Sequence, residues 1–563
     1  MSRILLRFVI GLVLIVMLLS LVAPNRPAHA DGLDGYVPGE VVLKLNSAAD
    51  LTGIASAYAL DLIPLDQFGS RPIFRMRILD DAAPPDRAAQ LAADPRVLYA
   101  EPNFIGRAPE GQPRPSWPTG VAGGNYPGQW AAGMLRLAEA HTVTRGAGVT
   151  VAVLDSGVDS SHPALAGRLI NGYDFVDMDA DPGEVGTSGV DLTYGHGTHV
   201  AGLVALVAPE ARIMPIRVLD VDGYSDIWVI AEALAYAIDP DGDPDTADGA
   251  DVINLSLSTE QQTDLLAEIV GAVTCERDDD PGEDDDCLVG TNQHGAVVVA
   301  AAGNGASEMA EYPAAEGVPG SLAVAASTWT DALASFSNHG SWVHVAAPGE
   351  DILSSVPGGG YAVWSGTSMA TPLAAGEAAL VRAANPGYST VDVVAQMISK
   401  TQGINGPVSK RLDAAAALNI PIISEYRCTG AVSNLTADNL IVPPGKTCTI
   451  LGAWIKGSVK VEEKAKLNAS ALYVKGGLQA KKAASVIISD SVINGGLQVE
   501  EGGSAQLKTS LIQSDVLFVK NTGSLTILNN TIHGNLQCKE NKLQPSGDGN
   551  IVQGNKEDQC SGL

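Results

Sequence analysis

Apolar and polar positions divide the chain into blocks of different character. Between residues 124 and 420, short and nearly continuous apolar runs such as 149–154 and 296–302 alternate with longer helix-like stretches such as 370–384. Continuous apolar runs of this length are typical of parallel strands that are buried on both faces. Their alternation with helices predicts an α/β fold whose mostly parallel sheet is covered by helices on both faces.

A smaller unit precedes this region. Residues 31–115 contain an extended segment at 36–45, a helical pattern at 87–93 and a second extended segment at 96–104, which together predict a small α+β domain. The Pro- and Gly-rich stretch 107–128 then reads as an exposed linker that is suited to cleavage.

The last part of the chain is repetitive. Residues 421–563 have a nearly balanced charge, many β-branched side chains and a unit that returns about every 19 to 20 residues. The recurring anchors are 457–461, 477–480, 496–499, 515–519 and 534–538. A period of this length with strand-like alternation favours an all-β solenoid, whose rungs stack into one core. A compact β-sandwich is the alternative.

The first thirty residues have the pattern of a secretory signal peptide. Arg3 and Arg7 precede an apolar run at 8–23, and small residues at 28–30 form a cleavage site. An uncleaved membrane anchor is the alternative, but the run is shorter than the roughly 20 residues that a span requires. We therefore expect a secreted, extracellular protein with no membrane span after removal of residues 1–30.

Charge and cysteine content agree with export. The formal net charge of −29 argues against binding to nucleic acid or to anionic membranes. Six cysteines, an even number, suit an oxidising compartment. Their clustering along the chain favours local disulfides. The expected pairs are Cys275 with Cys287, Cys428 with Cys448, and Cys538 with Cys560.

Three short motifs carry residue types that nucleophilic catalysis needs. Ser368 stands at a glycine-enforced turn, where we expect it to cap a helix that has Pro372 in its first turn. Asp155 follows a buried strand, and His196 opens a second apolar helix. A hydroxyl nucleophile needs a base and a group that orients the base, so the three motifs together point beyond an ordinary helix cap.

The three motifs resemble the signature blocks of the subtilisin-like serine peptidases, at 153–157, 196–202 and 366–370. The order Asp, His, Ser also matches that family. The resemblance implies that Asp155 orients His196, that His196 acts as general base and then acid, and that Ser368 is acylated. It further implies an endopeptidase that acts on protein or peptide substrates, and a peptidase domain at 124–420.

The resemblance extends to the oxyanion hole and the substrate cleft. Asn304 ends a buried strand and matches the asparagine that donates to the oxyanion. The matching cleft walls are Ser256, Leu257, Ser258, Ala301, Ala302 and Gly303. Ser258 departs from the family, where glycine is usual, and its side chain narrows the cleft. Glu311 matches a position near the pocket floor, where a carboxylate would attract Lys or Arg; a solvated rim glutamate is the alternative.

Residues 31–115 resemble the inhibitor propeptide of the same family, which implies synthesis as a zymogen with the propeptide as an intramolecular inhibitor. A permanent small α+β domain is the alternative. The chemistry implied needs no cofactor. The calcium loop of many relatives is missing after Gly202, and the acidic loops 177–181 and 239–245 are either substitute calcium sites or solvated turns.

Other histidines and motifs do not change this interpretation. His199 lies one turn beyond His196 and is read as structural, and no HExxH or CxxC pattern supports a zinc site. Any metal site is therefore left unassigned. A second hypothesis gives the main role to the repeats at 421–563, as a module that contacts a cell wall, a glycan or a partner. The intact motifs at Asp155, His196 and Ser368 favour the peptidase.

Overall fold

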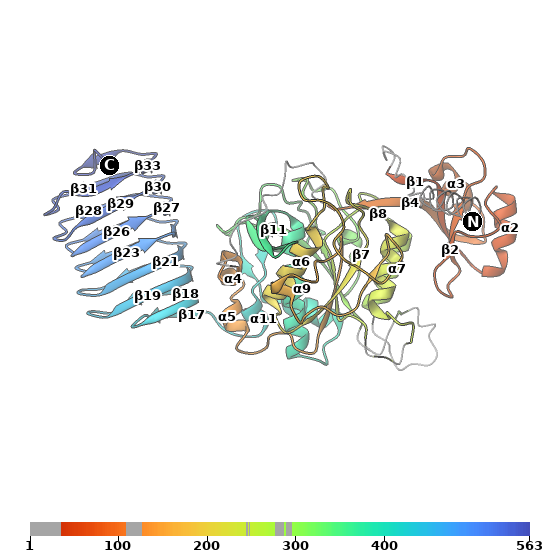
Figure 1. Cartoon of the computed structure of the whole chain (residues 1–563), viewed down its shortest axis with the longest axis horizontal. Coiled ribbons are helices and arrows are strands. Elements are labelled where there is room, and N and C mark those ends of the chain that lie inside the picture. The colour runs from red at the N-terminus through yellow and green to blue at the C-terminus, as the bar shows by residue number, and fades with distance from the viewer. Residues whose placement is uncertain (1–34, 109–125, 244–245, 247, 276–286, 289–294) are drawn as a thin grey trace, which may run out of the picture. The chain divides into compact units, whose positions relative to one another are not determined.

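The computed structural model describes residues 35–108, 126–243, 246, 248–275, 287–288 and 295–563 (Figure 1). The expected signal peptide at 1–30 and most of the expected linker lie outside the described residues. The chain forms two compact units, Met1–Ile105 with Asp226–Trp228, and Gly106–Ser225 with Val229–Leu563. No helix within the described ranges has the length and apolar character needed to cross a membrane.

The first unit is a small α+β structure, as the sequence predicts for this region. Strands β1 (Tyr36–Leu45), β2 (Asp66–Gln67), β3 (Ile73–Arg77) and β4 (Val97–Arg107) lie in the order β2-β3-β1-β4. All of these pairings are antiparallel. The inward side chains of β1 pack against helices α2 (Leu51–Ala57) and α3 (Pro84–Ala92), and α3 begins at a proline whose backbone φ is already helical.

The second unit contains a nine-stranded sheet that is parallel except at one edge. Its order is β15 (Gln402–Gly403), β16 (Lys410–Arg411), β12 (Val345–Pro348), β11 (Ser321–Ser327), β10 (Val297–Ala301), β9 (Val252–Leu255), β5 (Thr150–Asp155), β7 (Arg212–Arg217) and β6 (Tyr173–Asp174). Only β15 and β16 pair antiparallel. Every residue of the central strands β5, β9, β10 and β11 is buried, so both faces of the sheet are covered.

Two helices bring the motif residues to this sheet. Helix α6 (His196–Val207) packs against β5 and β7, and helix α9 (Thr367–Ala384) packs against α6 and against β9 to β12. All twelve residues of α6 are buried, which explains its continuous apolar sequence. Helix α10 (Thr390–Ser399) follows α9 and begins with a capping box formed by Ser389 and Asp392.

The start of α9 differs from the prediction at two positions. The N-cap is Gly366, so Ser368 is the second helical residue rather than the cap, and Pro372 lies in the second turn rather than the first. The reason is a distant partner, because the side-chain Oδ1 of Asn304 accepts the backbone N–H of Thr367 at 2.8 Å. That contact satisfies the first orphan donor of the helix and leaves Ser368 free of a capping role.

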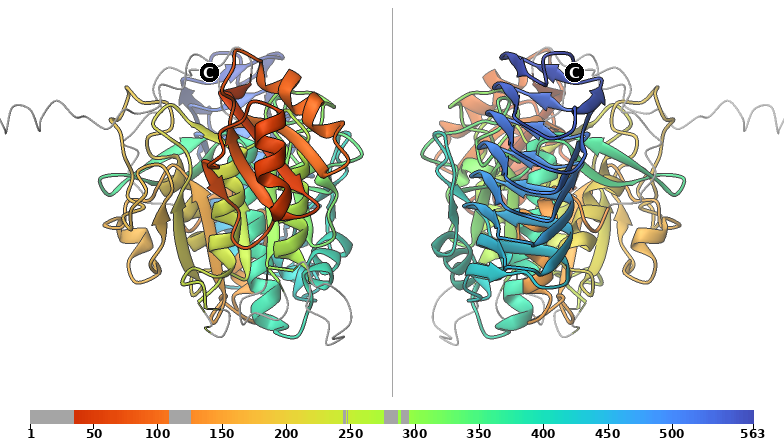
Figure 2. Two further views of the ribbon diagram at one scale, coloured as in Figure 1. Left: turned by 90° about the vertical axis from the view of Figure 1, so that its right-hand side faces the viewer. Right: turned by 90° about the vertical axis from the view of Figure 1, so that its left-hand side faces the viewer.

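The C-terminal part is an all-β region whose strands stack in parallel (Figure 2, right). One row consists of β22 (Leu478–Lys481), β25 (Leu497–Glu500), β28 (Val516–Val519), β31 (Leu536–Lys539) and β34 (Lys556–Asp558). The register places Leu478, Leu497, Val516 and Leu536 above one another, all buried. The recurring unit of the sequence is thus one layer of the stack.

The three expected disulfides are confirmed. The pairs are Cys275 with Cys287, Cys428 with Cys448, and Cys538 with Cys560. The second and third pairs lie at the two ends of the C-terminal stack, where fewer neighbouring strands support the backbone. The acidic run inside the first pair, 276–286, lies outside the described residues.

Candidate active site

Asp155 and His196 meet where β5 ends and α6 begins. His196 Nδ1 lies 2.7 Å from Asp155 Oδ1, and both side chains are almost completely buried. The same Asp155 oxygen accepts the backbone N–H of Ser156 at 2.8 Å. A carboxylate held in this way fixes the imidazole tautomer with the proton on Nδ1, which leaves Nε2 as the basic nitrogen.

Ser368 lies in the first turn of α9, beside the strand segment that follows β9. Its Oγ is 3.4 Å from the carbonyl oxygen of Ser256. In the opposite direction, the Ser256 hydroxyl donates to the Ser368 carbonyl at 3.1 Å. That carbonyl would normally accept from the residue four positions later, but this is Pro372, which has no N–H. Ser256 therefore replaces the missing helical bond and ties Ser368 to the neighbouring segment.

Asn304 lies after β10, beside the same helix end. Its Oδ1 accepts both the backbone N–H of Thr367 at 2.8 Å and the Thr367 hydroxyl at 3.1 Å. Two donors on the oxygen orient the carboxamide, so that its NH₂ group is the part able to donate to an anion near Ser368. The Thr367 hydroxyl also accepts the N–H of Gly303 at 3.1 Å, which anchors this loop to α9.

His199 is placed as the sequence predicts, away from the proposed chemistry. Its Nε2 lies 3.2 Å from the carbonyl oxygen of Ala362, and its ring stacks on Trp364 with centroids 4.4 Å apart. Burial lowers the pKa of His199 to about 3, so the ring is neutral at ordinary pH. Trp364 also stacks on His196 at 6.4 Å, a contact that no sequence motif indicated.

The predicted cleft walls converge on Glu311. The Ser258 hydroxyl donates to Glu311 Oε2 in a short hydrogen bond, and Asn338 Nδ2 donates to Oε1 at 2.7 Å. A Cβ atom on Gly303 would lie only 2.2 Å from Glu311 Oε1, so this close approach requires glycine. Burial raises the pKa of Glu311, and the two hydrogen bonds oppose that effect. Glu311 therefore bridges the two wall segments.

Glu184 is a polar residue of the site that sequence reasoning missed. It comes from the segment between β6 and α6, and it accepts hydrogen bonds from Ser156, Gly195 and Thr198. These partners flank Asp155 and His196 in the chain. No motif surrounds Glu184, and its partners lie up to 28 residues away, so no local pattern indicated it.

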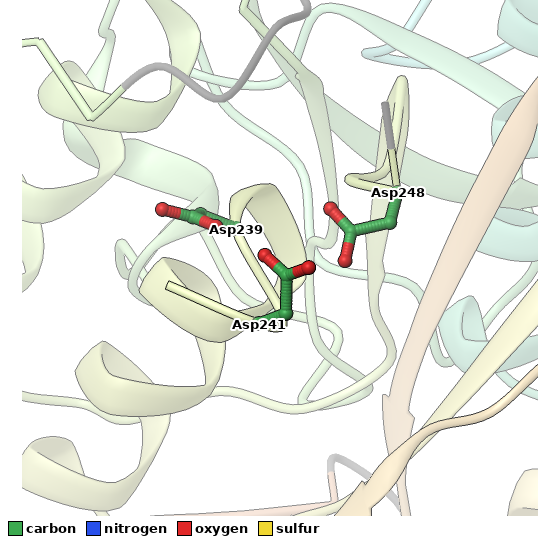
Figure 3. A group of neighbouring side chains, drawn as sticks. All are labelled: Asp239, Asp241 and Asp248. Carbon is green, nitrogen blue, oxygen red and sulfur yellow. The ribbon is translucent and has the colours of Figure 1, made fainter. Parts of the chain in front are cut away.

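The two acidic loops behave differently. In the first loop, Asp177 pairs with Arg217 at 2.6 Å, so its carboxylate already has a cationic partner. In the second, Asp239 and Asp241 join Asp248 beyond the end of α7 (Ile227–Ile238), with ligand oxygens within 4.8 Å of one another (Figure 3). Burial is the largest cause that raises the pKa of Asp239, and the carboxylates of Asp241 and Asp248 raise it further. Three oxygen donors at this spacing are of the kind that Ca²⁺ prefers.

Comparison with known proteins identifies the family. Residues 146–419 match the model of the Subtilase family. The chain is 39% identical over 313 residues to a thermophilic serine proteinase of Bacillus sp. (strain AK1), covering 53% of this chain and 66% of that protein. It is 35% identical over 288 residues to thermitase of Thermoactinomyces vulgaris, covering 49% of this chain and 90% of thermitase.

One solved structure supports the fold. It is the crystal structure of fervidolysin from Fervidobacterium pennivorans, described as a keratinolytic enzyme related to subtilisin. The match has a TM-score of 0.53 and 23% identity, and it covers 71% of this chain and 64% of that one. That match concerns the fold. The relatives and the matched family model show that the chain belongs to the subtilase family and is a subtilisin-like serine endopeptidase.

Proposed function

We propose that the chain is a secreted endopeptidase, made as a zymogen, that hydrolyses peptide bonds through Asp155, His196 and Ser368. The observation that carries the proposal is the 2.7 Å contact between His196 Nδ1 and buried Asp155, at the start of helix α6, which packs against the helix α9 that holds Ser368. His196 Nε2 takes the Ser368 proton as the hydroxyl attacks the carbonyl carbon. It then returns the proton to the leaving amine, while Asp155 stabilises the transient imidazolium.

Asn304 is assigned to the oxyanion hole. The support is the pair of hydrogen bonds from Thr367 to Asn304 Oδ1, which fix the carboxamide next to the nucleophile. Its NH₂ group then donates to the oxygen that becomes negative in the tetrahedral intermediate. The positive end of the α9 dipole also stabilises the negative charge on this oxygen.

Backbone pairing near the cleft supports synthesis of the enzyme as a zymogen. The N–H and carbonyl of Arg107 both bond to Ser258 at 2.8 Å, in the antiparallel manner of an extended substrate. Ala108 N–H then donates to the Gly223 carbonyl at 3.1 Å. We infer that the end of the propeptide follows the path of a substrate towards Ser368, and that cleavage falls in the segment after Ala108.

This path predicts that maturation requires Ser368. Secreted Ser368→Ala protein should retain residues 31–108, whereas the wild type should begin within 109–130. N-terminal sequencing and intact mass of both proteins, expressed in a host lacking extracellular proteases, measure the difference. Adding a trace of active wild-type enzyme should process the variant in trans. Normal maturation of Ser368→Ala alone would contradict self-processing.

We further propose that Glu311 gives the primary pocket a preference for Lys and Arg. Its carboxylate lies between the two wall segments, bonded to Ser258 and Asn338, and is largely shielded from water. A buried carboxylate is costly without a cation, and a substrate ammonium or guanidinium entering the pocket would supply one. The alternative of a solvated rim glutamate is disfavoured by these two bonds.

Glu311→Gln should therefore lower kcat/KM for substrates with Arg before the cut by about 10-fold or more, and change Phe and Leu substrates by less than about threefold. Because the folded pKa of Glu311 is raised, the wild-type preference for Arg should also fall as the pH drops towards that pKa, as the carboxylate takes up a proton. Glu308→Gln, on an exposed side chain of the same loop, is the matched control. Equal profiles for Glu311→Gln and wild type on a peptide library would favour a broad apolar pocket.

A structural calcium ion is proposed at Asp239, Asp241 and Asp248, with no role in the chemistry. The cation would relieve the repulsion that raises the pKa of Asp239. Removing calcium with a chelator should lower the Tm of the wild type by several degrees, and excess Ca²⁺ should restore it. Asp241→Asn should lose most of this response while keeping kcat at temperatures well below its Tm. A Tm that is the same with chelator and with Ca²⁺ would exclude the site.

We also infer that residues 421–563 form a β-solenoid. The support is the parallel stacking of its strands: from β22 to β31, each strand pairs in parallel with the third strand further along, as β22 does with β25 and β25 with β28. A β-sandwich would pair its strands mainly antiparallel. An experimental structure with antiparallel pairing in this region would contradict the inference.

A further inference from the structure

The Glu184 carboxylate takes hydrogen bonds from the start of the helix that carries His196. Oε1 accepts the backbone N–H of Gly195 at 2.9 Å. Oε2 accepts the Thr198 hydroxyl at 2.7 Å and the Thr198 backbone N–H at 3.3 Å. The N-cap of α6 is Gly195, which has no side chain to cap the helix. Glu184 therefore supplies, from a distant segment, the acceptor that a capping side chain would provide.

The same carboxylate also holds the segment that carries Asp155. Glu184 Oε1 accepts the hydroxyl of Ser156 at 2.8 Å, and that hydroxyl in turn accepts the N–H of Gly197 at 3.0 Å. The two segments touch closely here, because a Cβ atom on Gly197 would lie 2.2 Å from the Gly157 carbonyl oxygen. One carboxylate thus joins the end of β5 to the first turn of α6.

We propose that Glu184 is a positioning residue of the catalytic site, which fixes the distance between Asp155 and His196 and places a negative charge beside the helix end where imidazolium forms. The inference rests on the proposed triad. Glu184 does not touch the reacting atoms. Its effect comes through the four hydrogen bonds to Ser156, Gly195 and Thr198, because an error of about 1 Å in a catalytic pair can cost on the order of 100-fold in rate.

Opposing effects act on the pKa of Glu184. Burial raises its pKa to about 7, nearby Asp155 acts in the same direction, and the bonds from Thr198, Gly195 and Ser156 favour the ionised form. Titratable groups nearby are His196, which follows Gly195 in the chain, Asp159, whose backbone N–H donates to the Thr198 hydroxyl at 2.9 Å, and Tyr194, whose pKa is raised by burial and by Glu184. The geometry needs an ionised acceptor, so the clamp weakens as the pH falls through about 7.

The test compares Glu184→Gln and Glu184→Ala with wild type, after titration of active sites with a fluorophosphonate. We expect kcat per titrated site to fall about 10- to 100-fold, with KM changed less than about twofold. Loss of the negative charge makes protonated His196 less favourable, so the acid limb of kcat/KM should move to lower pH. Asp191→Asn is the matched control, because its carboxylate lies on the same segment and accepts the backbone N–H of Thr187 at 2.7 Å.

A merely structural role would lower the Tm and the titratable fraction and leave both kcat per site and the acid limb unchanged. That result would overturn the proposal. If the Glu184 variants do not fold, Ser156→Ala removes one arm of the clamp and leaves the helix cap in place. We expect it to lower kcat per site at least threefold; an unchanged kcat would overturn the proposal. Absence of wild-type labelling at Ser368 would instead refute the proposed triad.

Discussion

Replacing Ser368 by alanine is expected to lower peptide hydrolysis on the order of 10⁶-fold, the scale known for the equivalent loss in subtilisin. His196→Ala should cost about as much, because nucleophile and base act as one unit and either loss removes acylation. The residual activity would come from the oxyanion site and substrate binding. Neither change should unfold the protein, since both leave the apolar packing of α6 and α9 in place.

Turnover of a peptide p-nitroanilide, fluorophosphonate labelling and Tm together measure this prediction. Labelling should vanish in Ser368→Ala while its Tm stays within a few degrees of wild type. Ser365→Ala is the matched control, because this nearby hydroxyl accepts the N–H of Asp351 at 2.8 Å and lies outside the proposed chemistry. Wild-type turnover by pure Ser368→Ala would show that another residue is the nucleophile.

Asn304→Asp is expected to lower kcat by about 10²- to 10³-fold with little change in KM, again the scale known from subtilisin. The substitution keeps an oxygen that can accept from Thr367, so the start of α9 remains satisfied. It removes the NH₂ donor and adds a negative charge where the oxyanion forms. The loss should therefore appear in the transition state rather than in substrate binding.

Asn304→Leu separates the effect of losing the hydrogen-bond donor on kcat from the effect of losing the helix contact on stability. It removes the acceptor for Thr367 as well, so its Tm should drop by more than that of Asn304→Asp, while its kcat falls by a similar factor. Asn385→Ala, which removes a side-chain bond to the Val381 carbonyl at the other end of α9, should leave kcat unchanged. If kcat of Asn304→Asp stayed within about threefold of wild type, the oxyanion assignment would be wrong.

Local pattern was sufficient for much of this molecule. The apolar run that became β10, the strand Tyr36–Leu45, the helix after Gly195 and the repeat of the C-terminal strands all follow from spacing within a single element. Such periodicity is set by which side of each element faces a core, and it is written in neighbouring residues. The disulfide pairs could also be predicted from the sequence, because each pair closes a short segment.

Tertiary structure decided what depends on partners distant in sequence. The helix that carries Ser368 begins at Thr367 because Asn304, 63 residues earlier, accepts its N–H. Glu311 accepts a hydrogen bond from Ser258, 53 residues earlier in the chain, and Glu184 follows the acidic loop 177–181, a stretch that by itself resembles a solvated turn. The sequence by itself was enough to predict which residues to propose for catalysis and which strands and helices hold them. Only the folded chain determined which carboxylates are desolvated and bonded, because burial and hydrogen bonding are properties of the packed segments together.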